Sequence, residues 1–233
     1  MPGSPPSTAS AGTPETLVGG APVAKDTLDR ALHHAPRLVA VDGGADHVLA
    51  VGRIPTRVVG DMDSLSDAAR AAFADVLQPI AEQDSTDFAK ALRTSDAPWS
   101  IGVGFIGARV DHFLACLTEL ARRRAAAPCI LLGEEDCVCV LPSRAMLSLP
   151  VGTRLSLWPM GPVTGRSTGL EWPIDGLDFG PATRVGTSNR TVAPLVTLAC
   201  DGGPMILILP SGALDAMLHM LEIGPRGPGA VDV

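Results

Sequence analysis

The chain has 233 residues, of which 46% are hydrophobic and 18% are charged, and its formal net charge is -7 at pH 7. These values are typical of a globular protein with one large or two small domains, and the acidic balance argues against a general nucleic-acid binder. No apolar run approaches the roughly 18 residues of a membrane span, and the first residues lack the features of a signal peptide. We therefore expect a cytoplasmic protein without nucleic-acid or membrane partners. Its five cysteines form no CxxC pair, which predicts reduced, buried thiols.

The first two thirds of the chain have the pattern of an α/β domain. Residues 1–14 are rich in Pro, Ser and Ala and predict a disordered tail. Over residues 15–142, short apolar runs alternate with helical patterns, which predicts buried parallel strands joined by helices. The expected strands lie at 37–42, 57–61 and 100–107, and the expected short helices lie around 73–77 and 88–92.

The clearest helical pattern begins at residue 110. Its apolar residues recur at helical spacing and form one continuous stripe, which we expect to pack on the sheet. The stripe consists of Val110, Phe113, Leu114, Leu117 and Leu120.

The pattern changes at about residue 143. Short alternating strands broken by Gly and Pro follow, with TRLSLW, APLVTLAC and MILILP as the clearest runs. Residues 143–233 therefore predict a small antiparallel β domain, which includes a short amphipathic helix from Leu214 to Leu221.

Several acidic residues follow predicted strands of the α/β domain. Asp42 ends the first strand and precedes Gly43-Gly44, where a backbone without Cβ allows close approach of a ligand. Asp61 and Asp63 end the second strand, and Asp111 follows the third. Ligands of open parallel sheets bind at the carboxyl ends of the strands, so we expect these carboxylates to meet there. Such like charges require either the protonation of one carboxylate or a cation, and Mg²⁺ is the natural cation because it prefers oxygen ligands.

Each acidic segment also has a simpler interpretation. Ser64 with Asp67, and Asp84 with Asp87, fit helix N-caps with a carboxylate in the first turn. Asp42-Gly43-Gly44 alone is equally typical of a turn. The joint placement at strand ends favours the metal site.

Two cationic segments lie near the same edge. Thr86, Asp87 and Lys90 occupy the first turns of a predicted helix, whose N-terminus beside a lysine suits phosphate. Arg109 precedes the helix that begins near residue 110 and could bind phosphate oxygens with both arms of its guanidinium. The alternative for each segment is a surface ion pair.

The combined motifs resemble those of thiamine pyrophosphokinases. The matching runs are VDGGADHVL, GDMDSL, QDSTDFAKAL, GFIGARVDHFLACLTEL, GLEWPI and TSN, and they span residues 37 to 190. The resemblance implies a Rossmann-like parallel α/β domain followed by an antiparallel β-sandwich. It also implies a homodimer whose active sites lie between the subunits, with ATP and thiamine as substrates and Mg²⁺ as cofactor.

The resemblance also assigns roles to individual residues. It places Mg²⁺ on Asp42, Asp61, Asp63 and Asp87. It places the chemistry and the ATP phosphates on Asp61, Asp63, Asp87, Lys90, Arg109 and Asp111, with Asp42, Gly43, Gly44, Ser64, Asp84, Thr86 and His112 as further ATP contacts. It places thiamine on Trp172, Thr187, Ser188 and Asn189, where a tryptophan face would attract the thiazolium cation.

Two departures affect the expected nucleotide contacts. Ala108 stands where the family commonly has a second glycine, and only a short segment, Gly19-Gly20-Ala21, precedes the first helix. Two other functions use the same residues. One is a Mg²⁺-dependent pyrophosphotransferase or hydrolase that acts on another acceptor, and the other is a nucleotide-binding regulatory module.

Overall fold

The computed structural model describes residues 12–223, so most of the predicted tail lies outside the described residues. The helices are α1 (Lys25–His34), α2 (Gly44–Ala50), α3 (Asp67–Ala72), α4 (Asp87–Arg93), α5 (Val110–Arg122) and α6 (Leu214–Met220). The strands of the first half are β1 (Glu15–Val18), β2 (Arg37–Val41), β3 (Arg57–Gly60), β4 (Leu77–Pro79), β5 (Ser100–Val103) and β6 (Cys129–Leu132). Those of the second half are β7 (Asp136–Val140), β8 (Arg144–Ser148), β9 (Arg154–Pro159), β10 (Val163–Thr168), β11 (Asp178–Phe179), β12 (Gly186–Arg190), β13 (Leu195–Gly202) and β14 (Met205–Pro210).

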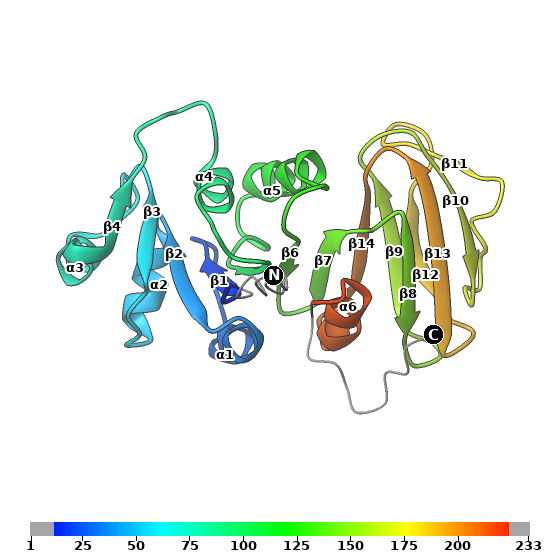
Figure 1. Ribbon diagram of the computed structural model, residues 1–233, viewed down its shortest axis with the longest axis horizontal. Helices are drawn as coiled ribbons and strands as arrows, with labels where there is room; N and C mark the ends of the chain where they lie inside the picture. The colour runs from blue at the N-terminus through cyan, green and yellow to red at the C-terminus, as the bar shows by residue number, and fades with distance from the viewer. Residues whose placement is uncertain (1–11, 224–233) are drawn as a thin grey trace, which may run out of the picture.

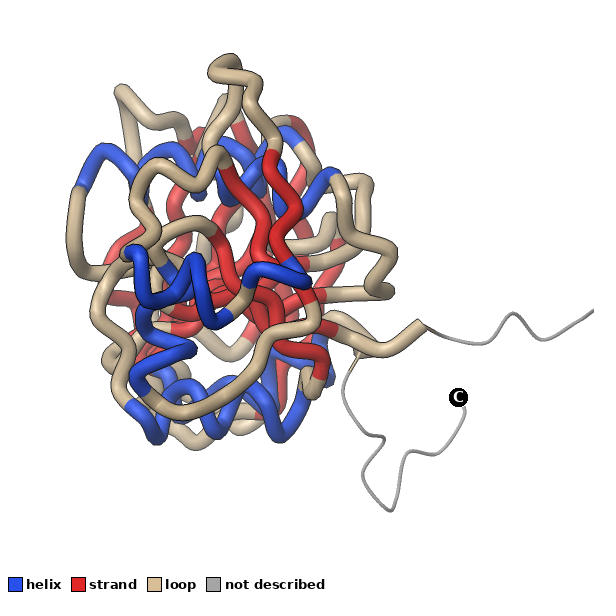
Figure 2. Tube along the Cα trace, turned by 90° about the vertical axis from the view of Figure 1, so that its left-hand side faces the viewer, coloured by secondary structure: helices blue, strands red, loops and turns tan. Residues whose placement is uncertain are grey.

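A parallel sheet with helices on both faces forms the first half. The strands pair in the order β6-β5-β1-β2-β3-β4, all parallel. Helices α1 and α2 cover one face, and α4 and α5 cover the other (Figure 1), which Figure 2 shows from the β4 end. Neighbouring strand residues point into different cores: Val18 packs with the α1 side and Leu17 with the α4 side. This two-sided burial explains the continuous apolar runs of the sequence.

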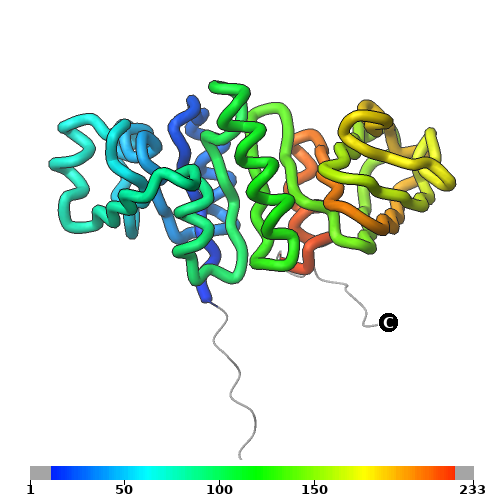
Figure 3. The backbone as a smooth tube through the Cα atoms, turned by 90° about the horizontal axis from the view of Figure 1, so that it is seen from above, coloured from blue at the N-terminus to red at the C-terminus, as the bar shows by residue number. Residues whose placement is uncertain are grey.

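The main sheet continues into the second half of the chain. Strand β7 pairs antiparallel with β6, and β14, β9 and β12 extend the sheet to ten strands. A second sheet, in the order β11-β10-β13-β8, packs against this end, with Leu155 and Leu157 of one sheet in the same core as Val196 and Leu198 of the other. The predicted α/β fold with an antiparallel sandwich is confirmed. Seen from above, the two halves lie side by side (Figure 3).

A buried ion-pair group closes the edge of the parallel sheet where its strands begin. Glu15 is fully buried, and its carboxylate accepts hydrogen bonds from Arg37 Nη2 at 3.0 Å and Arg57 Nη2 at 3.2 Å. These are the first residues of β1, β2 and β3. A buried carboxylate needs such partners, so this group ties the three strands together.

Two helix predictions need correction. Residues 73–77 do not form a single helix, because α3 ends at Ala72, a 3₁₀ turn covers Ala74–Val76, and Leu77 begins β4. The stripe on α5 packs on the sheet only along its second half, because Val110 and Leu114 are 70% and 53% exposed. Because the apolar stripe runs along the whole helix, it did not reveal that the first turns project beyond the sheet.

The cysteines and the helices agree with two further expectations. All five cysteines are buried and free. Among the described residues, no helix combines the length and the apolar character that crossing a bilayer requires.

Candidate active site

A pocket of about 580 Å³ lies at the edge of the parallel sheet where the strands end. Its wall is built from the loops after β1, β2, β3 and β5 and from the starts of α4 and α5. This is the edge at which open α/β sheets bind their ligands. The sequence-predicted residues in its lining are Asp42, Gly43, Asp61, Ser64, Thr86, Asp87, Lys90, Arg109 and His112.

Three carboxylates meet at this pocket. Asp42, Asp61 and Asp63 each place an oxygen within 4.8 Å of the others. Asp42 is 8% exposed, and its buried Oδ1 has no hydrogen-bond partner. Burial, together with smaller effects of neighbouring carboxylates, raises the pKa of Asp42 above its usual range. The cluster therefore holds a buried carboxyl oxygen that no described side chain satisfies.

The backbone conformation brings these carboxylates together. Asp42 has a φ of 43°, in the left-handed region, directly after β2. Gly60 ends β3 with a φ of 154°, and a Cβ there would lie 2.9 Å from Asp42 Cβ and 3.2 Å from Asp87 Oδ1. A side chain at position 60 would thus force Asp42 and Asp87 away from β3. Glycine is required because two acidic residues crowd this position.

A buried lysine lies beside the acidic cluster. Lys90 is 1% exposed, and its Nζ lies 2.9 Å from Asp87 Oδ1 and 3.6 Å from Asp61 Oδ2. Burial would lower the pKa of Lys90, but the hydrogen bond with Asp87 and the charge of Asp61 outweigh it and raise the pKa. The lysine therefore stays protonated and binds Asp87, which lies outside the group of three carboxylates.

Asp61 is held in its charged form. Burial would raise the pKa of Asp61, but hydrogen bonds from the Asp63 N–H at 3.4 Å and Gln83 Nε2 at 3.3 Å, with a nearby lysine, lower it. One lysine cannot neutralise the four carboxylates Asp42, Asp61, Asp63 and Asp87. A hard divalent cation fits this donor set, because it would satisfy the unpartnered Asp42 oxygen with the oxygen ligands that Mg²⁺ prefers.

The loop before α5 differs from the prediction for Asp111. Arg109 Nη2 donates to Asp111 Oδ2 at 2.7 Å, and both side chains are about two-thirds exposed. Asp111 does not line the pocket or join the carboxylate cluster, whereas Arg109 does line the pocket. The sequence predicted that four strand-end carboxylates would meet, and the structure brings together three of them, Asp42, Asp61 and Asp63. Gly107 makes the turn here with a φ of 102°, so Ala108 needs no glycine conformation.

The helix caps lie at other residues than predicted. Ser66 caps α3 and accepts from Ala69 N at 3.1 Å, and Thr86 caps α4 and accepts from Ala89 N at 3.2 Å. Ser64 is thereby free to line the pocket and to donate to Asp63 Oδ1 at 2.9 Å. Asp84 is exposed and lies outside the pocket lining.

Glycines shape the pocket in ways that the sequence did not reveal. A Cβ at Gly44 would lie 1.9 Å from the Val18 carbonyl oxygen, so this glycine serves the packing of α2 on β1 and does not line the pocket. Gly19 and Gly104 follow β1 and β5, and a Cβ on either would come within 2.6 Å of the other's carbonyl. Phe105 lines the pocket beside them. A glycine directly after each short strand was the available signal.

The predicted thiamine residues lie at the opposite end of the main sheet. Trp172 is 56% exposed, and its backbone is fixed by buried Asn189, which accepts from Trp172 N at 3.2 Å and donates to Trp172 O at 2.7 Å. Thr187 and Ser188 are exposed on β12. Seven strands separate β12 from β3, so one chain does not bring these residues to the acidic pocket.

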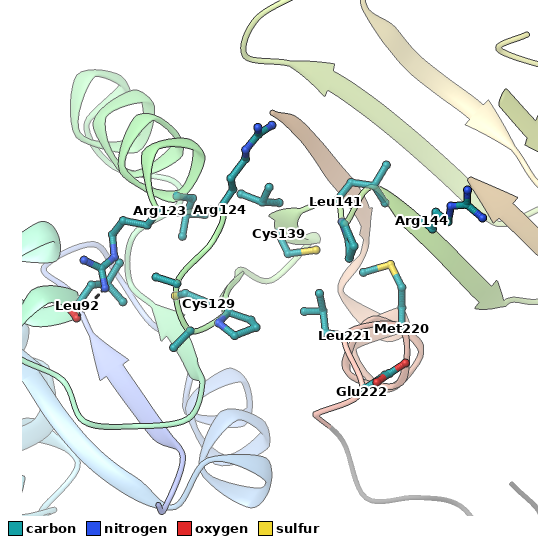
Figure 4. Close-up of a pocket in the computed structure, with 16 residues that line it drawn as sticks. Leu92, Arg123, Arg124, Cys129, Cys139, Leu141, Arg144, Met220, Leu221 and Glu222 are labelled. Atoms are coloured by element: carbon teal, nitrogen blue, oxygen red, sulfur yellow. Dashed lines mark hydrogen bonds between the residues drawn. The ribbon is translucent and has the colours of Figure 1, made fainter. Parts of the chain in front are cut away.

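A second cavity, of about 300 Å³, lies between the two halves of the chain (Figure 4). Two of its arginines are engaged, since Arg123 donates to the Leu92 carbonyl at 3.1 Å and Arg124 to the Gly202 carbonyl at 2.9 Å. Burial raises the pKa of the Cys129 and Cys139 thiols that line it, so both stay neutral. The cavity lining includes one carboxylate, Glu222, in place of the carboxylate cluster of the first pocket.

An acidic cluster beside a buried lysine at the carboxyl edge of a parallel sheet is an arrangement that could bind a metal ion and phosphate groups. Residues 28–131 match the family described as thiamin pyrophosphokinase, catalytic domain. This part of the chain is therefore similar to the catalytic domain of thiamin pyrophosphokinases.

Solved structures show the same fold over most of the chain. The protein is similar to thiamin pyrophosphokinase from Geobacillus thermodenitrificans, at 24% identity and a TM-score of 0.72 over 85% of this chain and 97% of that one. It is also similar to yeast thiamin pyrophosphokinase, at 16% identity and a TM-score of 0.74 over 89% of each chain. No protein of curated function matches the chain by sequence.

Proposed function

We propose that the protein is a thiamine pyrophosphokinase that binds Mg²⁺ and the ATP phosphates at the acidic pocket. In this reaction the thiamine hydroxyl oxygen bonds to the β-phosphorus of ATP, the bond from the β-phosphorus to the oxygen bridging it to the α-phosphorus breaks, and AMP leaves. A carboxylate of the cluster would accept the hydroxyl proton. Such a transfer depends mainly on positioning and on charge neutralisation.

Different residues of the pocket would bind the metal and neutralise the phosphate charges. Asp42, Asp61 and Asp63 would hold Mg²⁺, which when bound would neutralise phosphate charge. Lys90, fixed by Asp87, would supply a second positive charge toward the phosphates. Arg109 is exposed at the pocket rim, where its guanidinium would bind phosphate oxygens in exchange for its surface ion pair.

The observation that carries this proposal is the unpartnered, buried oxygen of Asp42 within a cluster of three carboxylates. We expect purified protein with ATP, Mg²⁺ and thiamine to release AMP and thiamine diphosphate in equal amounts, with neither product formed when the metal is chelated. Separation of the products by chromatography would measure both. AMP release that does not depend on thiamine would instead indicate a hydrolase or another acceptor.

We further propose a homodimer in which each acidic pocket is completed by Trp172 of the other subunit. From β3 to β12 the sheet makes eight strand-to-strand steps, which at about 4.8 Å each separates the two regions by roughly 38 Å. ATP and thiamine could not react across that distance within one chain. Val110 and Leu114 expose apolar surface on the helix that borders the pocket, as expected where a partner packs.

Complementation between two impaired variants tests this arrangement. Asp63→Asn should lower activity at least about 100-fold, and Trp172→Ala should raise the apparent thiamine constant about 10-fold. When the two variants are co-expressed, about a quarter of the native sites should reappear, because half of the dimers are mixed and each has one intact site. Activity would be measured at subsaturating thiamine.

The double variant co-expressed with wild type is the matched control. If the sites lie between subunits, a mixed dimer of wild type and double variant has no intact site. If each site belongs to one subunit, that mixed dimer keeps one intact site, and the two separate variants fail to complement each other. That pattern, or an active monomer, would contradict the proposal.

We propose a cytoplasmic location, supported by the reduced thiols and by the absence of a bilayer-spanning helix among residues 12–223. We also propose the division into residues 15–142 and 143–233. The change from parallel to antiparallel pairing between β6 and β7 supports a boundary in this region.

A further inference from the structure

The loop that carries Asp61 and Asp63 adopts an unusual backbone conformation. Met62, between the two acids, has a φ of 68°, in the left-handed region that side-chain-bearing residues rarely occupy. Its side chain is 4% exposed and packs in the core with the α3 residue Ala69. In an extended segment, alternate side chains lie on one face about 7 Å apart. In this loop the left-handed conformation of Met62 accompanies a closer approach than in an extended segment, because oxygens of Asp61 and Asp63 lie within 4.8 Å of each other.

Two neighbouring helices hold this loop. Arg70 of α3 donates from Nη2 to the Met62 carbonyl oxygen at 2.5 Å. Asp46 of α2 accepts from Ser66 N at 3.1 Å and also binds the Ser66 hydroxyl, which fixes the end of the loop. The Arg70 hydrogen bond is one of two side-chain contacts on the peptide that follows the left-handed residue, and the other is the longer bond from Asp63 N to Asp61 Oδ1 at 3.4 Å. The bond from Arg70 holds the peptide group that would rotate if Met62 returned to a more favourable, negative φ.

We infer that Arg70 is a positioning residue for the metal site and acts through the Met62 carbonyl. This inference rests on the proposed function, because Asp61 and Asp63 matter to it as metal ligands. Without the guanidinium, Met62 gains access to ordinary negative φ values, and Asp61 and Asp63 separate. The expected consequence is weaker metal binding in a protein that remains folded, since Arg70 itself is exposed.

Binding of Mn²⁺, measured by electron paramagnetic resonance, tests this inference without relying on catalysis. Arg70→Met keeps the apolar stem and removes the donors, so the Mn²⁺ dissociation constant should rise about 5- to 10-fold. Arg70→Lys, which can still donate to the carbonyl, should recover part of the affinity. Activity should follow the same order, with the Mg²⁺ concentration for half-maximal rate raised more than kcat is lowered.

Arg53→Met is the matched control. Arg53 is an exposed arginine that pairs with Asp29 at 2.7 Å, away from the metal loop, so its removal should leave Mn²⁺ affinity unchanged. Thermal unfolding would confirm that each variant is folded. If Arg70→Met bound Mn²⁺ as tightly as wild type, the inference would be overturned while the proposed function stood. If wild type bound no Mn²⁺ with or without ATP, both would fall.

Discussion

Replacing Lys90 by methionine should lower activity at least about 100-fold and destabilise the protein by about 3 kcal/mol. The variant keeps a buried apolar side chain but removes the cation that lies 2.9 Å from Asp87 and 3.6 Å from Asp61. The remaining carboxylates then face one another without a counter-charge. Their partial exposure limits the cost to the lower end of the range for broken buried pairs.

Chemical denaturation and the rate of AMP formation would measure the two effects. Lys25→Met is the control, because Lys25 pairs with Asp29 at the surface and is 74% exposed, so its loss should change stability by less than about 1 kcal/mol. Added Mg²⁺ should restore part of the stability of Lys90→Met without restoring activity. A variant as stable as wild type without metal would show that Lys90 does not compensate the acidic cluster.

Replacing Asp42 by asparagine should raise stability, whereas Lys90→Met lowers it, and should lower activity by a similar factor. The substitution removes a buried charge, and asparagine tolerates the left-handed conformation that Asp42 adopts. We expect a metal-free protein that is more stable by about 1 kcal/mol, or roughly 2–4 °C in Tm, at neutral pH. Activity should fall at least about 100-fold, because the cluster loses a metal ligand.

The pH dependence of this gain follows from the raised pKa of Asp42. Below the unfolded value of 3.8, the carboxyl is protonated in both states, so it does not penalise folding. As the pH rises toward the higher folded pKa, the unfolded chain ionises first and the folded state loses stability. The advantage of Asp42→Asn should therefore grow from about pH 3 to neutral pH. Melting curves across this range would measure it, and a constant difference would contradict the assignment.

The parts of the site that the sequence predicted depend on local order along the chain. Asp42, Asp61 and Asp63 directly follow apolar strands, and strand ends of a parallel sheet necessarily share an edge. Asp87 and Lys90 are three residues apart on one helix, so their pairing follows from helical geometry. These positions required no knowledge of contacts between distant residues.

The missed parts depend on such distant contacts. The first strand has four residues and begins with Glu15, whose complete burial is possible only because Arg37 and Arg57 arrive from two other strands. An isolated acidic residue therefore concealed the strand, although Gly19-Gly20-Ala21 after it was noted from the sequence, and these three residues line the pocket. Asp111 was misplaced for a local reason, since it lies in the exposed first turn of α5 and pairs there with Arg109, the residue before the helix.

The unbroken ten-stranded sheet restricts how the enzyme can close around its substrates. Hydrogen-bonded pairing runs from β4 at the acidic edge to β12 at the Trp172 end, without a linker between the two halves. A hinge there would have to break the β6–β7 ladder, so the two half-sites of one chain keep a fixed spacing. In the proposed dimer, shielding of ATP from water would then come from the loops at the pocket rim or from a rotation of one subunit against the other. Each chain would hold its two half-sites at a fixed distance, and the packing of the two chains would set the distance between the reacting groups.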